Sequence, residues 1–460
     1  MSVTRDFTLR ASGPLWQLPG GPVQLSGLLE HLTDDFEESI GRQVNASGSI
    51  FILAPSRSQS FDSTYVETLL PIFSPRNRRP GLEEIQLQFG ARRDEYKVDG
   101  ATALLTGIGS LPTTPVVRAS NRTQSNNFLV ALTYRPVADL ALRASYGTGF
   151  LPPTVNQVLP GSPSQPLSGA NLVDLRRGGT SVGTYQSISG GNPAIEPEES
   201  RSWSAGVIYS PKALSGFRVS LDYARIEKED NITALTPQQV IDNEAIFPGR
   251  VTRGPNLAND PVGWAGPVTV LNGSLVNLSE AKVEAFDTQL DYQHKTTGMG
   301  DFSLYFLATW QTSFETRLLP TTPVVENVGV GNFPLKFKAS GGVSWTLRRW
   351  TLGWSVQSFD SYWAADPTLA SSAPVLQRQG NGGRVPRQHY HNVFVRYRFQ
   401  GTPEGHWSAT LLGSGELTVG VRNFLNEHPP LDAGVLTQGY YSPFGDARLS
   451  SYYVSFVRRF

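Results

Sequence analysis

Hydrophobic and polar side chains alternate with a period of two along most of the chain. In the last segment, residues 450–460, Tyr452, Val454 and Phe456 fall on one face, and smaller or more polar side chains fall between most of them. Because successive side chains of a strand point to opposite faces of a sheet, this spacing predicts a β-strand and excludes a helical stripe.

The same alternation recurs in segments spread over the chain, and several of their apolar rows end in Tyr, Trp or Phe. The clearest are Leu140–Tyr146, Trp203–Tyr209, Phe217–Tyr223, Phe302–Trp310 and Val393–Phe399. Aromatic residues at the ends of apolar rows are typical of the girdles of membrane barrels. A soluble β-sandwich also alternates, but its strands are usually about five or six residues long. The pattern therefore favours an all-β fold, an antiparallel transmembrane β-barrel.

The expected connections alternate between short and long. The short turns are Pro136–Ala138, Pro211–Gly216, Lys295–Gly300 and Arg348–Arg349, and the long loops are Leu151–Ser200, Asn231–Leu278, Phe314–Phe333, Asp360–Gln388 and Asn426–Leu449. In an up-and-down barrel the short turns are periplasmic and the long loops extracellular. We therefore expect the last strand to run toward the periplasm.

Counting strands back from the C-terminus gives about fifteen, beginning with Phe7–Leu18. The first and last would both run toward the periplasm, and two such strands cannot be antiparallel neighbours. Bacterial single-chain barrels have an even number of strands. We therefore expect that the chain does not close by itself and that further sequence belongs before Met1. The N-terminal residues show no signal-peptide pattern.

Composition narrows the classes of function. The chain has 39 Lys and Arg against 39 Asp and Glu, so its net charge gives no drive toward nucleic acid. It contains no Cys, which excludes disulfides, thiolate metal sites and cysteine nucleophiles. No apolar run approaches the roughly 18 residues of a spanning helix.

The sequence predicts no catalytic site and no cofactor. No G-x-S-x-G, P-loop or H-E-x-x-H motif is present. Glu198 and Glu199 are consecutive, so on a strand their carboxylates point to opposite faces and do not form an acid–base pair. His389 and His391 share a strand face, a spacing that suits a shared metal, but no third ligand is evident. We therefore expect neither an enzyme nor a metal site.

Four blocks carry a resemblance to a known family. They are YGTGFLPPTVNQ (Tyr146–Gln157), GNPAIEPEESRSWSAGV (Gly191–Val207), NLSEAKVEAFDTQLDY (Asn277–Tyr292) and GVRNFLNEHPP (Gly420–Pro430), and the chain ends on Phe460. In order and spacing the chain resembles the C-terminal part of the barrel of TonB-dependent outer-membrane receptors. The positions that match the family motifs are Tyr146, Gly149, Phe150, Pro152, Pro153, Asn192, Pro193, Pro197, Glu198, Asn423 and Phe460. It departs at Leu151, Ala285, Asp287 and Arg458.

The residues of these motifs have a structural interpretation first. We expect the four prolines to end strands where extracellular loops begin, because proline fixes φ and lacks a donor. Glu198 is expected in a polar network of the lumen or its rim. Gly147, Gly149 and Gly206 suit a close approach of the backbone or a bend in a barrel wall.

The resemblance implies a 22-stranded barrel with an N-terminal plug domain, of which residues 1–460 would be one partial barrel domain without plug or signal peptide. It implies a monomer in the outer membrane of a Gram-negative bacterium, in contact with lipid. For the full-length protein it implies a small-molecule ligand and energy from the TonB–ExbB–ExbD system. The implied activity is uptake of a scarce nutrient, with a ferric siderophore as the default cargo and an oligosaccharide or cobalamin-type compound as the alternative. Relatives that carry haem are expected to have His between the first two blocks, and Thr154–Gly190 contains none.

Two other classes stay open. A smaller even-stranded barrel would act as a passive pore or adhesin and close from this chain alone. A secreted β-sandwich or propeller that binds carbohydrate would lack a continuous apolar outer band.

The long loops carry the candidate ligand contacts. Aromatic side chains stack on sugar or catechol rings, and arginines neutralise an anionic siderophore. The candidates are Arg176, Arg177, Arg250, Arg253, Trp264, Tyr362, Trp363 and Arg378.

Overall fold

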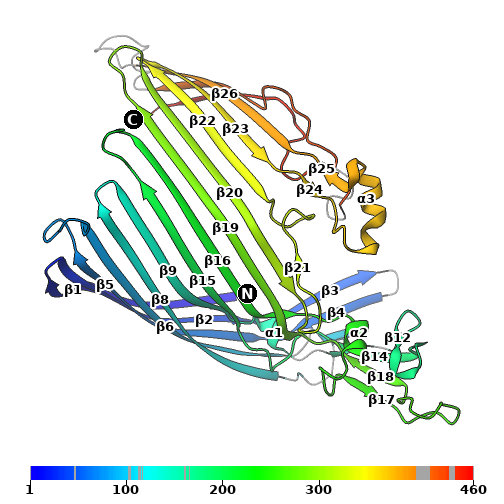
Figure 1. The fold of residues 1–460 in the computed structure, drawn as a ribbon. Helices are drawn as coiled ribbons and strands as arrows, with labels where there is room; N and C mark the ends of the chain where they lie inside the picture. The colour runs from blue at the N-terminus through cyan, green and yellow to red at the C-terminus, as the bar shows by residue number, and fades with distance from the viewer. Residues whose placement is uncertain are drawn as a thin grey trace.

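The computed structural model describes residues 2–45, 48–101, 105–111, 116, 118–159, 162–164, 166–399, 415–434 and 441–458. Fifteen antiparallel strands follow one another in a single curved sheet (Figure 1). They are β1 (Ser2–Leu18), β2 (Gly21–Phe36), β5 (Arg57–Phe73), β6 (Glu84–Ala101), β8 (Arg118–Val137), β9 (Leu140–Leu151), β15 (Glu198–Tyr209), β16 (Phe217–Thr233), β19 (Val276–His294), β20 (Asp301–Arg317), β22 (Phe337–Leu347), β23 (Trp350–Phe359), β26 (Gln388–Arg398), β27 (Glu416–Arg422) and β28 (Ser451–Val457). This confirms the predicted all-β antiparallel fold and the count of about fifteen strands. Within the described residues, β1 pairs only with β2 and β28 only with β27, so the sheet is open.

The short and the long connections lie at opposite ends of the strands, as predicted. The turns β8–β9, β15–β16, β19–β20 and β22–β23 are short, and the long loops lie at the other end of the strands. The long loops are shorter than expected where strands continue, as in β16, which reaches Thr233, and β19, which starts at Val276. Strict alternation does not hold for the connection from β26 to β27, which spans 399–415 on the side of the short turns. Most of that connection, like Phe460, lies outside the described residues.

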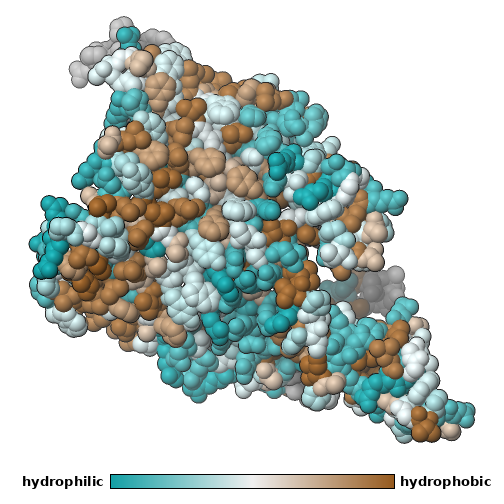
Figure 2. Space-filling view, viewed as in Figure 1, coloured by the Kyte–Doolittle hydropathy of each residue, from teal (hydrophilic) through white to brown (hydrophobic). Residues whose placement is uncertain are grey.

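One face of the sheet is apolar. Phe302, Leu304 and Phe306 of β20 are exposed on this face. Aromatic rings form rows across neighbouring strands, with Phe128, Tyr146 and Trp203 in one row and Tyr223, Phe286 and Trp310 in another. Figure 2 shows apolar side chains gathered over the strands. An apolar band bordered by aromatic rows is the lipid-facing surface of a membrane barrel. No helix among the described residues is long and apolar enough to cross a membrane.

Beyond the aromatic rows, the same face becomes charged toward the long loops. The guanidinium of Arg225 lies 5.6 Å from the ring of Trp203 and pairs with Glu227. Lys282 Nζ lies 3.1 Å from Glu284 Oε1 on the adjacent strand β19. β8 has 20 residues, about twice the 9–11 that a tilted membrane-spanning strand needs. The strands therefore continue past the apolar band and support the long loops.

The opposite face is polar and carries ion pairs between strands. Arg143 of β9 binds Asp222 of β16 through two contacts of 2.8 and 2.6 Å, which cross over Gly206 of the intervening strand β15. A Cβ atom on Gly206 would lie 1.8 Å from Asp222 Oδ1. A side-chain carboxylate, not the backbone, thus approaches Gly206 closely, and a larger residue at this position would have to displace it.

Replacing Gly206 with Ala should therefore displace the Asp222 carboxylate and weaken the ion pair. We expect a loss of about 1–3 kcal/mol in the free energy of unfolding, the usual cost of overpacking a filled site. Urea unfolding of the protein in detergent measures it. Gly13→Ala in β1 is the matched control, since a Cβ there meets nothing within 4 Å. Equal midpoints for the two variants would contradict the assignment.

The long loops contain their own secondary structure. In Figure 1 these elements cluster at one end of the sheet. They are β3 (Ser39–Asn45), β4 (Gly48–Ala54) and β7 (Leu105–Ile108); α1 (Val155–Val158), β10 (Ser162–Pro163), β11 (Leu167–Ser168), β12 (Val173–Asp174), η1 (Leu175–Arg177), β13 (Thr180–Ser181) and β14 (Thr184–Ser189); α2 (Pro237–Asp242), β17 (Val251–Arg253) and β18 (Val268–Asn272); β21 (Val325–Glu326); and β24 (Tyr362–Trp363), η2 (Ala370–Ser372), α3 (Ala373–Gln379), η3 (Asn381–Gly383) and β25 (Arg384–Val385).

Two of these loops fold together. Residues 152–197 and 234–275 contribute β14 and β18, which pair in parallel and continue into a small sheet with β10, β11 and β17. Buried side chains of both loops, among them Tyr185, Val240 and Leu271, share one apolar core, which also includes Leu319 of a third loop. We call residues 152–197 and 234–275 the loop module.

Candidate ligand-binding loops

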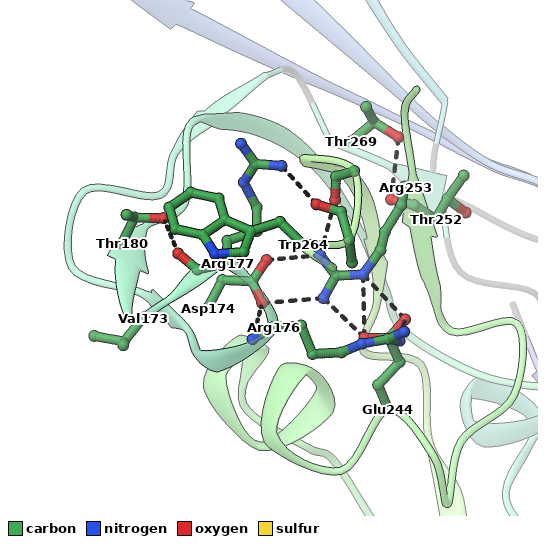
Figure 3. A network of polar contacts seen from close by, with 12 residues as sticks. Val173, Asp174, Arg176, Arg177, Thr180, Glu244, Thr252, Arg253, Trp264 and Thr269 are labelled. Carbon is green, nitrogen blue, oxygen red and sulfur yellow. Dashed lines mark hydrogen bonds and ion pairs between the residues drawn. The ribbon is translucent and has the colours of Figure 1, made fainter. Parts of the chain in front are cut away.

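Arg253 is the centre of a buried ion-pair network in the loop module (Figure 3). Its guanidinium lies 2.6 Å from Asp174 Oδ2 and 2.8 Å from Glu244 Oε2. The side chains of Arg253 and Asp174 are only 12% and 1% exposed. Arg176 Nη1 reaches the same Glu244 carboxylate at 2.8 Å, although its side chain is 60% exposed. The network joins the two loops, since Asp174 comes from one and Glu244 and Arg253 from the other.

Arg177 and Trp264 form a second link between the loops. Arg177 donates to both carboxylate oxygens of Asp260, at 2.9 and 2.5 Å, and to the carbonyl oxygen of Ala265. Its guanidinium lies 5.2 Å from the ring of Trp264. The ring of Trp264 packs against Gly178, where a Cβ atom would lie only 2.7 Å from Trp264 Cζ2. Gly178 also has a positive φ of 64°.

Arg250 is bound to backbone carbonyls. Its Nη1 donates to Asn272 O and Ser274 O at 3.1 and 2.6 Å, and its Nη2 donates to Leu275 O at 3.2 Å. Burial lowers the pKa of the Arg250 guanidinium from its usual value. The structure thus brings five of the predicted ligand contacts together, but gives Arg177, Arg250, Arg253 and Trp264 structural roles. Ligand contact by these residues stays a prediction.

The carboxylates of these links make the loop module sensitive to acid. Burial opposes ionisation of Glu244, but hydrogen bonds from Arg253 and Arg176 outweigh it, so the pKa of Glu244 is lowered. Hydrogen bonding from Arg177 lowers the pKa of Asp260. A lowered native pKa contributes stability above the unfolded pKa, and this contribution is lost as the pH falls through the native pKa.

We therefore expect amide hydrogen exchange in the loop module, corrected for the intrinsic rate, to be constant down to about pH 5 and to accelerate below about pH 4, where free carboxyls titrate. The far part of strand β19, Asp287–His294, which lies outside the core of the loop module, serves as the internal reference. Uniform behaviour of module and reference over this range would contradict the prediction.

The remaining three candidates lie in a different loop. Tyr362 is fully buried, and its hydroxyl lies 2.7 Å from Asp432 Oδ2 and 3.1 Å from Ser442 Oγ. Burial raises the pKa of this hydroxyl. Trp363 is covered by the guanidinium of Arg384, 4.9 Å from its ring centre. Arg378 is exposed in the last turn of α3. Tyr362 therefore belongs to the core that joins 360–387 to 423–450, and Arg378 remains available to solvent.

Replacing Tyr362 with Phe should loosen that junction. The variant keeps the ring but removes the hydroxyl from buried Asp432, at a cost of about 1–3 kcal/mol. We expect a protease to cleave the folded Tyr362→Phe variant faster within residues 423–450 than it cleaves the wild-type protein. Tyr441→Phe is the control in the same loop, because Tyr441 is 53% exposed. Equal cleavage rates for both variants would contradict the role of the hydroxyl.

The family-motif residues have mainly structural contacts. Tyr146 packs on Trp203 with ring centres 5.4 Å apart. A Cβ on Gly149 would lie 2.9 Å from Ser200 Oγ. Pro152 and Pro153 follow the end of β9, and Pro197 precedes β15, as predicted, but Pro193 lies within the loop between β14 and β15 and ends no strand. Phe150 is half-buried near the end of β9.

The other motif positions join loops to strands. Pro193 O accepts a hydrogen bond from Asn121 Nδ2 at 2.6 Å, and Asn192 Nδ2 donates to Leu275 O. Glu198 is bound by Lys228 Nζ at 2.6 Å and by the backbone N–H of Ile232, which confirms its predicted polar network. Asn423 has a positive φ of 50° and caps the loop through Glu427.

A pocket of 410 Å³ lies between the two loops of the module, and sequence reasoning missed it. Its lining comes from residues within 187–191 and 271–275, together with Asn156 and Gln157 of α1 and the residues Ala234, Leu235 and Pro237 around the start of α2. The available signal was the Gly and Ser in both stretches, which permit close backbone approach. Among the described residues, no group of three or more His, Asp or Glu is placed to hold a metal ion.

Comparisons with known proteins identify the fold. A family model described as "TonB dependent receptor-like, beta-barrel" matches residues 3–424. No curated protein matches the chain. Among solved structures, the ferric-catecholate import receptor Fiu from Escherichia coli K12 has a TM-score of 0.56 at 11% identity, over 99% of this chain and 54% of that one.

Two further structures are similar. The hemophore receptor HasR of Serratia marcescens, in complex with its hemophore HasA and heme, gives a TM-score of 0.51 at 16% identity, over 92% of this chain and 56% of that one. The ferric enterobactin receptor PfeA of Pseudomonas aeruginosa gives a TM-score of 0.50 at 14% identity, over 99% of this chain and 61% of that one. At these identities the likeness shows the fold alone, and the chain spans less than two thirds of each structure.

Proposed function

Since the chain belongs to the TonB-dependent receptor β-barrel family, we propose that the protein serves TonB-energised uptake of a ferric siderophore across the outer membrane of a Gram-negative bacterium. Members of this family are outer-membrane transport receptors, not enzymes. The observation that carries the proposal is the loop module, two loops that fold together around an apolar core, which also includes Leu319 of a third loop, beyond one end of a sheet with an apolar band.

The cargo is the finer part of the proposal. Fiu and PfeA are named for ferric catecholates and ferric enterobactin, which supports a siderophore. HasR is named for a hemophore, and the absence of His in 154–190 speaks against haem for this chain. The full-length protein would bind one small-molecule ligand and draw energy from TonB–ExbB–ExbD.

The test is uptake by the host bacterium. We would delete the gene and compare accumulation of ⁵⁵Fe as a ferric catecholate, haem iron and labelled cobalamin, each with and without TonB. The expected result is loss of ferric-catecholate uptake alone, restored by the gene only when TonB is present. Unchanged uptake in the catecholate arm, or restoration without TonB, would reject the proposal.

A further inference from the structure

The pocket of the loop module is built from apolar walls and a neutral polar rim. Leu271 and Leu235 are 1% and 5% exposed, and Leu275 and Pro237 complete the apolar wall. The rim is made of uncharged polar side chains. These are Asn156, Gln157, Ser187 and Ser189.

Backbone hydrogen bonds join the two stretches that line the pocket, as a continuation of the parallel pairing of β14 with β18. Gly273 N donates to Ile188 O at 2.9 Å, and Leu275 N donates to Gly190 O at 3.1 Å, so the stretches from both loops are fixed side by side along the pocket. A Cβ on Gly191 would lie 2.2 Å from Leu159 O, so this turn requires glycine. The pocket is therefore bordered by backbone hydrogen bonds and does not depend on the rotamer of one side chain.

The charges of the loop module are used internally. Its four arginines, Arg176, Arg177, Arg250 and Arg253, all bind carboxylates or carbonyls of the module. The two loops carry five carboxylates, and no charged residue lines the pocket. An anionic group placed there would lose its hydration without gaining a cation from the lining, which is strongly unfavourable. The guanidinium of Arg57 in β5 lies behind the lining, where it donates to Asn156 Oδ1 at 2.9 Å. The occupant that fits is uncharged.

We propose that this pocket binds an uncharged, largely apolar group of the transported ligand, such as a substituted aromatic ring with a hydroxyl that the rim serines can hydrogen-bond. The inference rests on the proposed function, because it assigns a part of the transported ligand to the loop module. The pocket volume of 410 Å³ lies in the range of about 300–1,000 Å³ that small-molecule sites have. A charged part of the same ligand would bind elsewhere.

The test uses two fluorinated probes of nearly equal size and different charge, 4-fluorobenzyl alcohol and 4-fluorobenzoate. Binding to the native protein, purified in detergent from the outer membrane of its host, is followed by ¹⁹F line broadening against protein-free micelles. We expect the alcohol to bind at least tenfold more tightly than the benzoate.

A variant places the binding in the pocket. Ala234 is exposed at the pocket lining, so Ala234→Trp should cover the opening and weaken binding of the alcohol at least tenfold. Ala170→Trp adds the same side chain at an exposed position of the same module outside the pocket and should change nothing. Equal hydrogen-exchange protection of the module core in both variants shows that the fold is kept.

Equal binding of the two probes, or equal binding to the wild-type protein and the Ala234→Trp variant, would overturn the inference. The uptake experiment fails or succeeds separately. Alcohol binding without any TonB-dependent uptake would reject the proposed function and leave the pocket standing as a binding site. Ferric-catecholate uptake without alcohol binding would keep the function and reject the pocket.

Discussion

Replacing Arg253 with Met is expected to open the loop module while the large sheet stays folded. The change removes the cation that two carboxylates share, and one of them, Asp174, has a side chain that is only 1% exposed. Removing one partner of a buried ion pair costs about 3–5 kcal/mol, because the remaining charge is left without compensation. Methionine keeps much of the aliphatic volume, so the loss reports the charge more than a cavity.

Hydrogen exchange resolved by segment is the measurement for this prediction. In Arg253→Met, amides of 152–197 and 234–275 should exchange faster, whereas amides of β19 and β20 should not. Arg176→Met is the matched control, since its side chain binds the same Glu244 but is 60% exposed. Exposed ion pairs contribute about 0–1 kcal/mol. Equal acceleration in both variants would show that Arg253 is not the centre of the network.

The strands could be predicted because the membrane imposes their pattern. A strand with lipid on one side and polar groups on the other must alternate with a period of two. Phe302, Leu304, Phe306 and Trp310 display that pattern without any tertiary information. The predicted ends of the strands were less accurate where the strands continue beyond the apolar band. β16 continues through Asp230, where neither face demands apolar residues and alternation fades.

The chemistry of the loops could not be predicted in the same way. Asp174 and Arg253 are 79 residues apart, and no local pattern marks a contact over that separation. Arginine in a long loop suggested ligand contact, because loops often carry function. The structure shows instead that Arg177, Arg250 and Arg253 satisfy carboxylates and carbonyls of their own module. The pocket was missed for the same reason, since its lining residues come from separate loops.

Replacing Leu304 with Arg and replacing Leu307 with Arg, both in β20, should have opposite effects on the amount of folded protein. The two leucines are similarly exposed, at 40% and 45%, but lie on opposite faces of one strand. Leu304 belongs to the apolar face, whereas Leu307 lines a hollow with Asp287 and Ser340 on the polar face. Arg on the lipid face of a barrel costs about 2–4 kcal/mol near the bilayer midplane. Leu304→Arg should therefore strongly reduce the folded protein in the outer membrane, and Leu307→Arg should leave it nearly unchanged.

The amount of folded protein is measured by the mobility shift between unheated and heated samples of outer membranes on gels containing detergent. Because exposure and residue type are matched, the comparison depends only on what solvates each face. Lipid cannot hydrate a guanidinium. On the polar face, water can hydrate it and the neighbouring carboxylate of Asp287 can pair with it. Equal loss at both positions would mean that the two faces meet the same environment, as in a soluble sandwich. Equal tolerance would mean that neither face contacts lipid, and the membrane-barrel assignment would fail with it.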